Sequence, residues 1–259
     1  HGSWMGSPVF DGARCFNGMA PDLMEHCARI IRSSKAMLMN PEVTPEKIYE
    51  ISKIGIKKLG VKKDIYIRPL IWAEDSMGLL RCDPNSTNFC ISIIEMPMPS
   101  ESGFSACTTK FTRPTALSAP TDAKAACLYP NGARAMQYAY ENGFDNAIIM
   151  DPFGYVAEFA SSNIFSVINS EVYTPEPNGT FLAGITRKTV LKLLRDMNVV
   201  VHECKLSLEM LKCSSEIFSS GNYGKVMYLN NLDGKKFKSG HIYKKVKKAY
   251  WDYSRDFKI

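Results

Sequence analysis

Apolar residues recur at helical spacing in two stretches of the first part of the chain. Residues 21–38, PDLMEHCARIIRSSKAML, carry them every three or four positions behind an initial proline. Residues 44–60 repeat the pattern, and Thr44, Pro45 and Gly60 are typical of an N-cap, a first helical position and a helix stop. The pattern therefore predicts two amphipathic helices here.

Two further stretches of the same part have the composition of strands. Residues 64–74 and 87–97 are rich in β-branched and aromatic residues, although Pro69 marks an edge or a bulge in the first. The segment MPMPSESG follows them and is typical of a linker. We expect a small domain over residues 1–97 and a linker at 98–103.

Helical and strand patterns alternate over the rest of the chain, residues 104–259, which we expect to form a larger domain. Helices are predicted at 131–143, 185–198 and 207–213. Strands are predicted at 145–151, 155–168, 171–175, 199–204 and 216–221. The alternation predicts an α/β or α+β domain, and hence a two-domain chain of the α/β class.

Composition and charge narrow the class of protein. Of the 259 residues 45% are hydrophobic and 22% are charged, which is typical of a globular protein with a substantial core. The sequence has no run of eighteen apolar residues, so it gives no indication of a membrane-spanning helix. The net charge is +6, and residues 234–258 are rich in lysine. We interpret them as a solvated basic helix face; the alternative is a nucleic-acid-binding or acidic-membrane patch, but no nucleic-acid motif accompanies it.

The cysteines argue against metal and disulfide scaffolds. None forms a C-x-x-C pair or joins a Cys/His cluster, so we expect no metal site. Scattered free cysteines in a chain of this length fit a reducing cytoplasm, which is the location we expect. The eight are Cys15, Cys27, Cys82, Cys90, Cys107, Cys127, Cys204 and Cys213.

Four residues together match the needs of one cofactor. Lys124 lies just before a helix, Glu158 in an otherwise apolar strand, Thr186 at a helix start and Arg29 on the apolar pattern of the first helix. Each has an ordinary alternative: a surface lysine, a water-facing acid, a helix cap and an ion-pair partner. Pyridoxal phosphate needs an amine for its aldehyde, an acid for its ring nitrogen, and a helix start with a cation for its phosphate.

Seven motifs then identify a family. The chain resembles the class IV (fold type IV) pyridoxal-phosphate aminotransferases, and within them the branched-chain amino acid aminotransferases. The motifs occur in the family's order along essentially the whole chain: GSPVFDGAR, EHCAR, YIRPLI, AKAACLYPN, DPFGYVAEFASSNIF, TPEPNGTFLAGITR and EIFSSGNYGKV.

The resemblance implies an architecture as well as an activity. It implies a fold like that of D-amino acid aminotransferase, with two α/β domains and the cofactor in the cleft between them. The family's first strands lie before residue 1, so the small domain looks incomplete. A homodimer or higher homo-oligomer is implied, in which a small-domain loop completes the partner's pocket.

The resemblance assigns the reactive groups to three residues. Lys124 matches the lysine that forms the Schiff base with the cofactor and afterwards moves the proton. Tyr129 matches the tyrosine that hydrogen-bonds the phenolic oxygen of the cofactor, and Glu158 matches the carboxylate on its pyridine nitrogen.

The resemblance also assigns the anion-binding residues. Arg29 matches the phosphate-binding arginine, and Ile185 with Thr186 matches the phosphate cup at a helix N-terminus. Asn222 and Tyr223 fall in the loop that holds the substrate carboxylate, and Asn222 also faces the cofactor in the family's pattern.

The substrate pocket is implied by residues of the small domain. Tyr66 and Arg68 match residues that reach the pocket in the branched-chain group. Phe10, Tyr66 and Trp72 are candidates for an apolar wall, and Arg68 and Arg14 for its polar edge. Such a pocket would accept both aliphatic side chains and the carboxylate of glutamate.

The implied reaction transfers the amine of a branched-chain L-amino acid to 2-oxoglutarate. Two departures affect donor preference. Met5 replaces a pocket tyrosine, and Asn222 with Tyr223 replaces the threonine and alanine that the family often has. A D-amino acid aminotransferase and an aminodeoxychorismate lyase of the same fold are the nearest alternatives. A non-catalytic family member and a basic nucleic-acid-binding module are the others.

Overall fold

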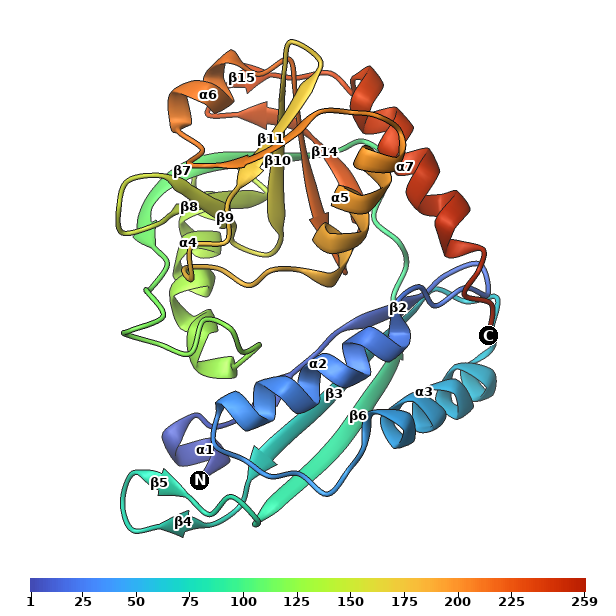
Figure 1. The fold of residues 1–259 in the computed structure, drawn as a ribbon, viewed down its shortest axis with the longest axis vertical. Helices are drawn as coiled ribbons and strands as arrows, with labels where there is room; N and C mark the ends of the chain where they lie inside the picture. The colour runs from blue at the N-terminus through green and yellow to red at the C-terminus, as the bar shows by residue number, and fades with distance from the viewer. The chain divides into compact units, whose positions relative to one another are not determined.

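A computed structural model describes residues 1–259, and they form two compact units (Figure 1). The first unit comprises His1–Met98, Pro120–Tyr129 and Tyr253–Ile259; the second comprises Pro99–Ala119 and Pro130–Asp252. Both units contain helices and sheet, so the predicted two-domain α/β class is confirmed. Lys124 packs with the first unit although it follows the expected linker, and the domain boundaries stay a prediction.

The sheet of the first unit is antiparallel and is centred on one long strand. β3 (Ile65–Ala73) pairs with β6 (Thr87–Glu95) on one side and with the short strands β1 (Val9–Phe10) and β2 (Ala13–Cys15) on the other. A small hairpin and a short helix complete the unit: β4 (Ser76–Met77), β5 (Arg81–Cys82) and α1 (Gly2–Met5).

Two helices pack on this sheet, as the hydrophobic pattern predicts. They are α2 (Leu23–Ala36) and α3 (Pro45–Leu59). Thr44 caps α3 by accepting a hydrogen bond from the backbone N–H of Lys47 at 3.2 Å, and Gly60 follows its last turn with a φ of 111°. The local signals for the start and stop of α3 are thus confirmed.

Pro69 contradicts one prediction. It lies in the middle of a central strand rather than at an edge, and β3 keeps one register through it from Ile65 to Ile71. The carbonyl of Pro69 accepts a hydrogen bond from Asp11 N at 3.1 Å. Because proline has no backbone N–H, it cannot donate the second hydrogen bond of this pair, to the carbonyl of Asp11. The sheet tolerates the loss of that one bond without a bulge.

A larger sheet forms the second unit. Its strand order is β12-β11-β10-β13-β14-β7-β8-β9, with β15 beside β14. The β11/β12, β14/β7 and β7/β8 pairs are parallel and the others antiparallel. The strands are β7 (Phe104–Thr112), β8 (Asn146–Met150), β9 (Val156–Phe159), β10 (Asn163–Ile168), β11 (Glu171–Pro175), β12 (Val201–Cys204), β13 (Glu216–Gly221), β14 (Lys225–Leu232) and β15 (Lys235–Lys236).

Helices follow or cover these strands. Phe165 of β10 stacks on Phe218 of β13, with ring centroids 5.1 Å apart. Residues of α5 (Ile185–Asp196) and α7 (His241–Ser254) pack around this pair. Neighbouring residues such as Ile164 and Ile217 belong to a second apolar cluster, because successive strand side chains alternate faces. The helices are η1 (Ala126–Leu128), α4 (Tyr129–Glu141), α5 (Ile185–Asp196), α6 (Leu208–Cys213) and α7 (His241–Ser254).

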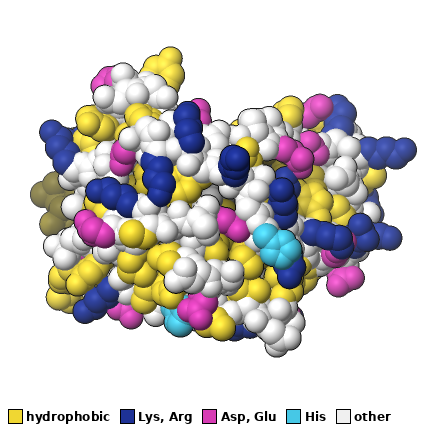
Figure 2. All heavy atoms as spheres, turned by 90° about the horizontal axis from the view of Figure 1, so that it is seen from above, with side chains coloured by type: hydrophobic (Ala, Val, Ile, Leu, Met, Phe, Trp, Pro, Cys, Tyr) yellow, Lys and Arg dark blue, Asp and Glu magenta, His cyan; other side chains and the backbone are white.

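Basic side chains on the surface are interspersed with acidic and apolar ones. Figure 2 shows this mixture on one face of the molecule. On α7, Lys248 pairs with Asp252 at 2.8 Å, and Lys247 pairs with Glu101 at 2.7 Å. This arrangement is consistent with the interpretation of the lysine-rich stretch as a solvated helix face. None of the helices has the length and apolar character that crossing a membrane requires.

Candidate active site

The backbone of Lys124 is held by two elements of the first unit. Its carbonyl accepts a hydrogen bond from Phe10 N at 3.0 Å, and the next residue, Ala125, bridges to Val9 of β1. Its N–H donates to the hydroxyl of the buried Ser33 on α2 at 3.0 Å. The segment that carries the amine is irregular, but a strand and a helix determine its position.

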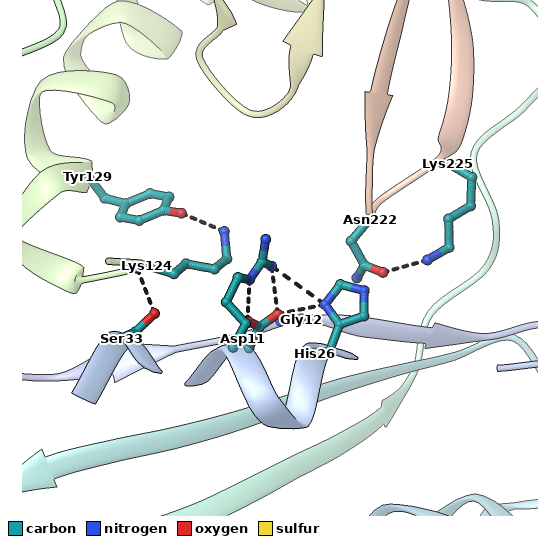
Figure 3. A network of polar contacts seen from close by, with 9 residues as sticks. Asp11, Gly12, His26, Ser33, Lys124, Tyr129, Asn222 and Lys225 are labelled. Carbon is teal, nitrogen blue, oxygen red and sulfur yellow. Dashed lines mark hydrogen bonds and ion pairs between the residues drawn. The ribbon is translucent and has the colours of Figure 1, made fainter. Parts of the chain in front are cut away.

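The amine of Lys124 lies beside the phenol of Tyr129 and the aromatic ring of Phe10. Nζ donates a hydrogen bond to Tyr129 Oη at 2.6 Å (Figure 3). It lies 4.9 Å from the ring centroid of Phe10 and 5.2 Å from that of Tyr129. The rings of Phe10 and Tyr129 are themselves in contact, with centroids 4.8 Å apart. The structure thus brings together three of the predicted residues in a setting unlike that of an ordinary surface lysine.

Arg29 forms a buried ion pair, the ordinary alternative that the sequence offered for it, with a partner that the sequence did not identify. Its Nε and Nη2 donate to the two carboxylate oxygens of Asp11 at 2.7 and 2.8 Å. His26 Nδ1 lies 2.7 Å from Asp11 Oδ1. The bidentate pair determines the plane of the guanidinium, and Nη1 takes no part in it. The phosphate-binding role of Arg29 stays a prediction.

The charge of Asp11 depends on its cationic neighbours. Burial by itself would raise the pKa of this carboxyl group, but the charges of Arg29 and His26 and their hydrogen bonds outweigh burial. The pKa of Asp11 therefore lies well below its usual range. The motif FDGAR contains a signal that could have identified Asp11 as the partner of Arg29, because it places an acid within an apolar strand pattern.

The predicted pocket residues of β3 share one face of the sheet. Tyr66, Arg68 and Trp72 alternate with buried isoleucines, and the guanidinium of Arg68 lies 5.1 Å from the ring centroid of Tyr66. Phe10 lies opposite Leu70 in the register and so belongs to the same face. The structure thus places these four candidates together.

Arg14 belongs to the same face, because it lies opposite Tyr66 in the register, and its guanidinium lies 6.0 Å from the ring centroid of Tyr66. Its side chain is completely buried, and Nη2 donates to the carbonyl of Pro97 at 2.8 Å. Both Nε and Nη2 also approach the sulfur of Met98. This placement gives Arg14 a structural contact with the end of the first unit, and its contact with substrate stays a prediction.

Glu158 is buried in β9 of the second unit and does not face water. It is 8% exposed. One carboxylate oxygen lies 3.3 Å from Nε of Arg113, and the other accepts a hydrogen bond from Asn163 Nδ2 at 3.3 Å. Arg113 also donates to the carbonyl of Thr180. The acid is therefore oriented by a cation and an amide that are themselves fixed.

The start of α5 has the features of an anion site. Gly184 is its N-cap and provides no side-chain cap, and the first bond within the helix is Lys188 N to Gly184 O. The N–H groups of the first turn therefore have no acceptor in the helix itself, and Ile185 and Thr186 are buried there.

Asn163 connects this helix start to Glu158. Its Oδ1 accepts from Gly184 N at 3.2 Å, while its Nδ2 donates to Glu158. A Cβ at Gly184 would lie 2.3 Å from Asn163 Oδ1, so a side chain there would displace the Asn163 amide. Sequence reasoning missed Asn163; the motif EFASSN places it five residues after Glu158, directly beyond a tight turn.

The loop between β13 and β14 contains Asn222 and Tyr223. Oδ1 of Asn222 accepts a hydrogen bond from Nζ of Lys225 at 2.7 Å (Figure 3). Nδ2 of Asn222 is buried without an acceptor in the protein. Tyr223 is 54% exposed. Lys225, the first residue of β14, is a further residue here that sequence reasoning missed.

Comparisons with known proteins identify the family. The model of the family described as amino-transferase class IV matches residues 8–231. A protein named probable branched-chain-amino-acid aminotransferase from Rickettsia felis is 32% identical over 93% of this chain and 84% of its own.

Solved structures agree. An aminotransferase from Brucella abortus bound to PLP is 43% identical, with a TM-score of 0.96, over 98% of this chain and 91% of that chain. The branched-chain amino acid aminotransferase of Escherichia coli is 27% identical, with a TM-score of 0.91, over 98% and 87%.

The chain belongs to the class IV aminotransferases. Within that class it groups with the branched-chain-amino-acid aminotransferases. The predicted family, fold type and pyridoxal-phosphate cofactor are therefore confirmed.

The residues of this chain fit that cofactor. The first unit offers an amine that is hydrogen-bonded to a phenol, Lys124 with Tyr129. The second unit offers a buried carboxylate at Glu158, the uncapped start of α5 and the unsatisfied amide donor of Asn222. These are the donors and acceptors that an aldehyde, a pyridine nitrogen and a phosphate require.

Replacement of Asp11 by asparagine tests the buried ion pair. Because the folded-state pKa is depressed, the pair contributes stability above the ordinary aspartate pKa of about 3.9 and loses it as the pH falls towards the folded value. At pH 7, D11N should lower the free energy of unfolding by about 3 kcal/mol, because it leaves Arg29 buried without its partner.

Urea unfolding between pH 7 and pH 3 measures both effects. D11N should lose less stability on acidification than the wild type does. The exposed Asp75 provides the matched control, D75N, which should keep the wild-type pH dependence. If D11N lost as much stability on acidification as the wild type does, the stabilising role of the Asp11–Arg29 pair would be contradicted.

Proposed function

We propose that this chain catalyses transamination between branched-chain L-amino acids and 2-oxoglutarate, giving branched-chain 2-oxo acids and L-glutamate. The observation that carries the proposal is the 2.6 Å contact of Lys124 Nζ with Tyr129 Oη. It occurs in a chain that belongs to the class IV aminotransferases and groups with the branched-chain enzymes. The amino acid donates its amine in a first half-reaction, and 2-oxoglutarate takes it in a second.

Lys124 and Tyr129 act on the reacting atoms in this proposal. Bound pyridoxal phosphate supplies an aldehyde that condenses with amines and a ring that withdraws electrons from the substrate α-carbon. Lys124 Nζ would hold the aldehyde and, when free, would take the proton from the substrate α-carbon. Tyr129 Oη hydrogen-bonds the phenolic oxygen.

Glu158 holds a proton at the pyridine nitrogen. Arg113 and Asn163 keep the carboxylate in place for that task. The phosphate is held by the first-turn N–H groups of α5 at Ile185 and Thr186, and further donors come from Arg29 and Asn222. These roles rest on the family's pattern together with the donor groups that each residue presents.

The substrate side chain contacts the aromatic face of the first unit. Phe10, Tyr66 and Trp72 form the apolar wall, and Arg68, with Arg14 as a second candidate, forms the polar edge. Asn222 and Tyr223 lie in the loop that receives the α-carboxylate. One methylene in such a pocket is worth about 1–3 kcal/mol, so discrimination among leucine, isoleucine and valine should be modest.

A homodimer or higher homo-oligomer is part of the proposal, supported by the resemblance to the branched-chain group. A cytoplasmic location is also proposed. It is supported by the eight cysteines, which are all free in the structure.

A panel of L- and D-amino acids with 2-oxoglutarate tests the function. L-leucine, L-isoleucine and L-valine should be the preferred donors, with glutamate formation as the readout. Met5 and Tyr223 could shift the preference towards larger donors within the L-series. D-alanine outperforming L-leucine would establish the D-amino acid alternative, and a holoenzyme without transamination on any donor would favour the lyase.

Labelling tests the role of Lys124. Borohydride reduction of the holoenzyme followed by peptide mapping should place the pyridoxyl group on Lys124. K124A should lose turnover by several orders of magnitude, because no amine remains to hold the aldehyde or to move the proton. The exposed Lys192 provides the control, since K192A should retain wild-type turnover. A label on any other lysine would refute the assignment.

Replacement of Glu158 by glutamine tests the proton at the pyridine nitrogen. E158Q should still bind cofactor but react at least tenfold more slowly, because a neutral amide cannot form the charge-assisted pair. The absorption spectrum of the bound cofactor reports binding, and single-turnover rates with L-leucine report the chemistry. Turnover like that of the wild type would show that Glu158 has a purely structural role.

A further inference from the structure

Lys225 is a buried lysine in an unusual backbone conformation. It is 1% exposed, begins β14 and has a φ of 57°. A positive φ is unfavourable for residues that carry a side chain, and a lysine is rarely buried so completely. Two unfavourable features at one position indicate that this side chain has a specific task.

The ammonium of Lys225 determines how the Asn222 amide is turned. Because an ammonium group has donors only, it binds the amide oxygen, and the 2.7 Å contact joins Nζ to Oδ1 (Figure 3). The amide NH2 must then point in the other direction. Nδ2 is indeed buried and has no acceptor in the protein. An acceptor oxygen from a bound ligand would satisfy this buried donor.

We infer that Lys225 is a positioning residue that presents Asn222 Nδ2 to an oxyanion. The inference rests on the proposed function, because the loop of Asn222 is the one expected to meet the substrate carboxylate or the cofactor phosphate. Both groups offer oxygen acceptors, and the positive charge behind the amide strengthens its N–H donors.

Four variants of the holoenzyme test this role: K225M, N222A, the double variant and the control K192M. Methionine matches the length of lysine without its charge. The probes are 4-methylpentanoate and the matching alcohol, 4-methylpentan-1-ol. Their dissociation constants are measured from the absorption band of the bound cofactor, and the dissociation constant of pyridoxal phosphate is measured on the apoenzyme.

K225M and N222A should each weaken one anion by about tenfold, as expected for the loss of a charge-assisted hydrogen bond. Weaker 4-methylpentanoate binding identifies the carboxylate as the ligand, and weaker pyridoxal-phosphate binding identifies the phosphate. Binding of the alcohol should not change. The double variant should be no worse than N222A, because Lys225 acts through Asn222. K192M should match the wild type.

Unchanged anion binding in K225M, or additive losses in the double variant, would overturn the inference. If K225M does not fold, N222A still tests the inference, because unchanged binding of both anions in N222A would overturn it. Failure of the proposed function would look different: wild-type holoenzyme would not convert L-leucine, whereas the four binding comparisons could still be made.

Discussion

Compensation of buried charge is the constraint on which the candidate active site depends. A charge can remain inside a protein only if opposite charges or hydrogen bonds replace its water. Asp11 meets this condition through Arg29 and His26, and Glu158 through Arg113 and Asn163. Each partner has a fixed geometry, so satisfying the charge also determines where the functional side chain lies.

Local signals in the sequence suffice for elements whose stability is itself local. The helix α3 begins and ends where Thr44, Pro45 and Gly60 predict, because capping involves neighbours along the chain. Pro69 misleads for the opposite reason. Whether a strand lies at an edge depends on residues far away, and here Asp11 supplies a partner for its carbonyl. The strands β7 and β14 escaped prediction because their patterns, FSACTTKFT and KVMYLNNL, alternate poorly.

The site residues divide in the same manner. Lys124, Tyr129 and Glu158 could be named as candidates because the reaction requires their chemistry and the family's motifs mark them. Ser33 and Asn163 could not, because they act by orienting other groups: Ser33 accepts from the backbone of Lys124, and Asn163 joins Glu158 to Gly184. A supporting residue needs only a suitable donor or acceptor at the right distance, and many residue types supply one.

The sign of each neighbouring charge then selects the orientation of the neutral groups. An ammonium accepts no hydrogen bond, so Lys225 leaves Asn222 only one orientation, with its oxygen inward. A carboxylate donates none, so Glu158 turns the NH2 of Asn163 towards itself, and the amide oxygen becomes available to Gly184 N. An asparagine is symmetric in shape but not in hydrogen bonding. A charged neighbour therefore converts it into a donor or an acceptor of fixed direction. In the loop of Asn222, Lys225 would in this way make a neutral amide selective for an anion, although the group that contacts the anion carries no charge.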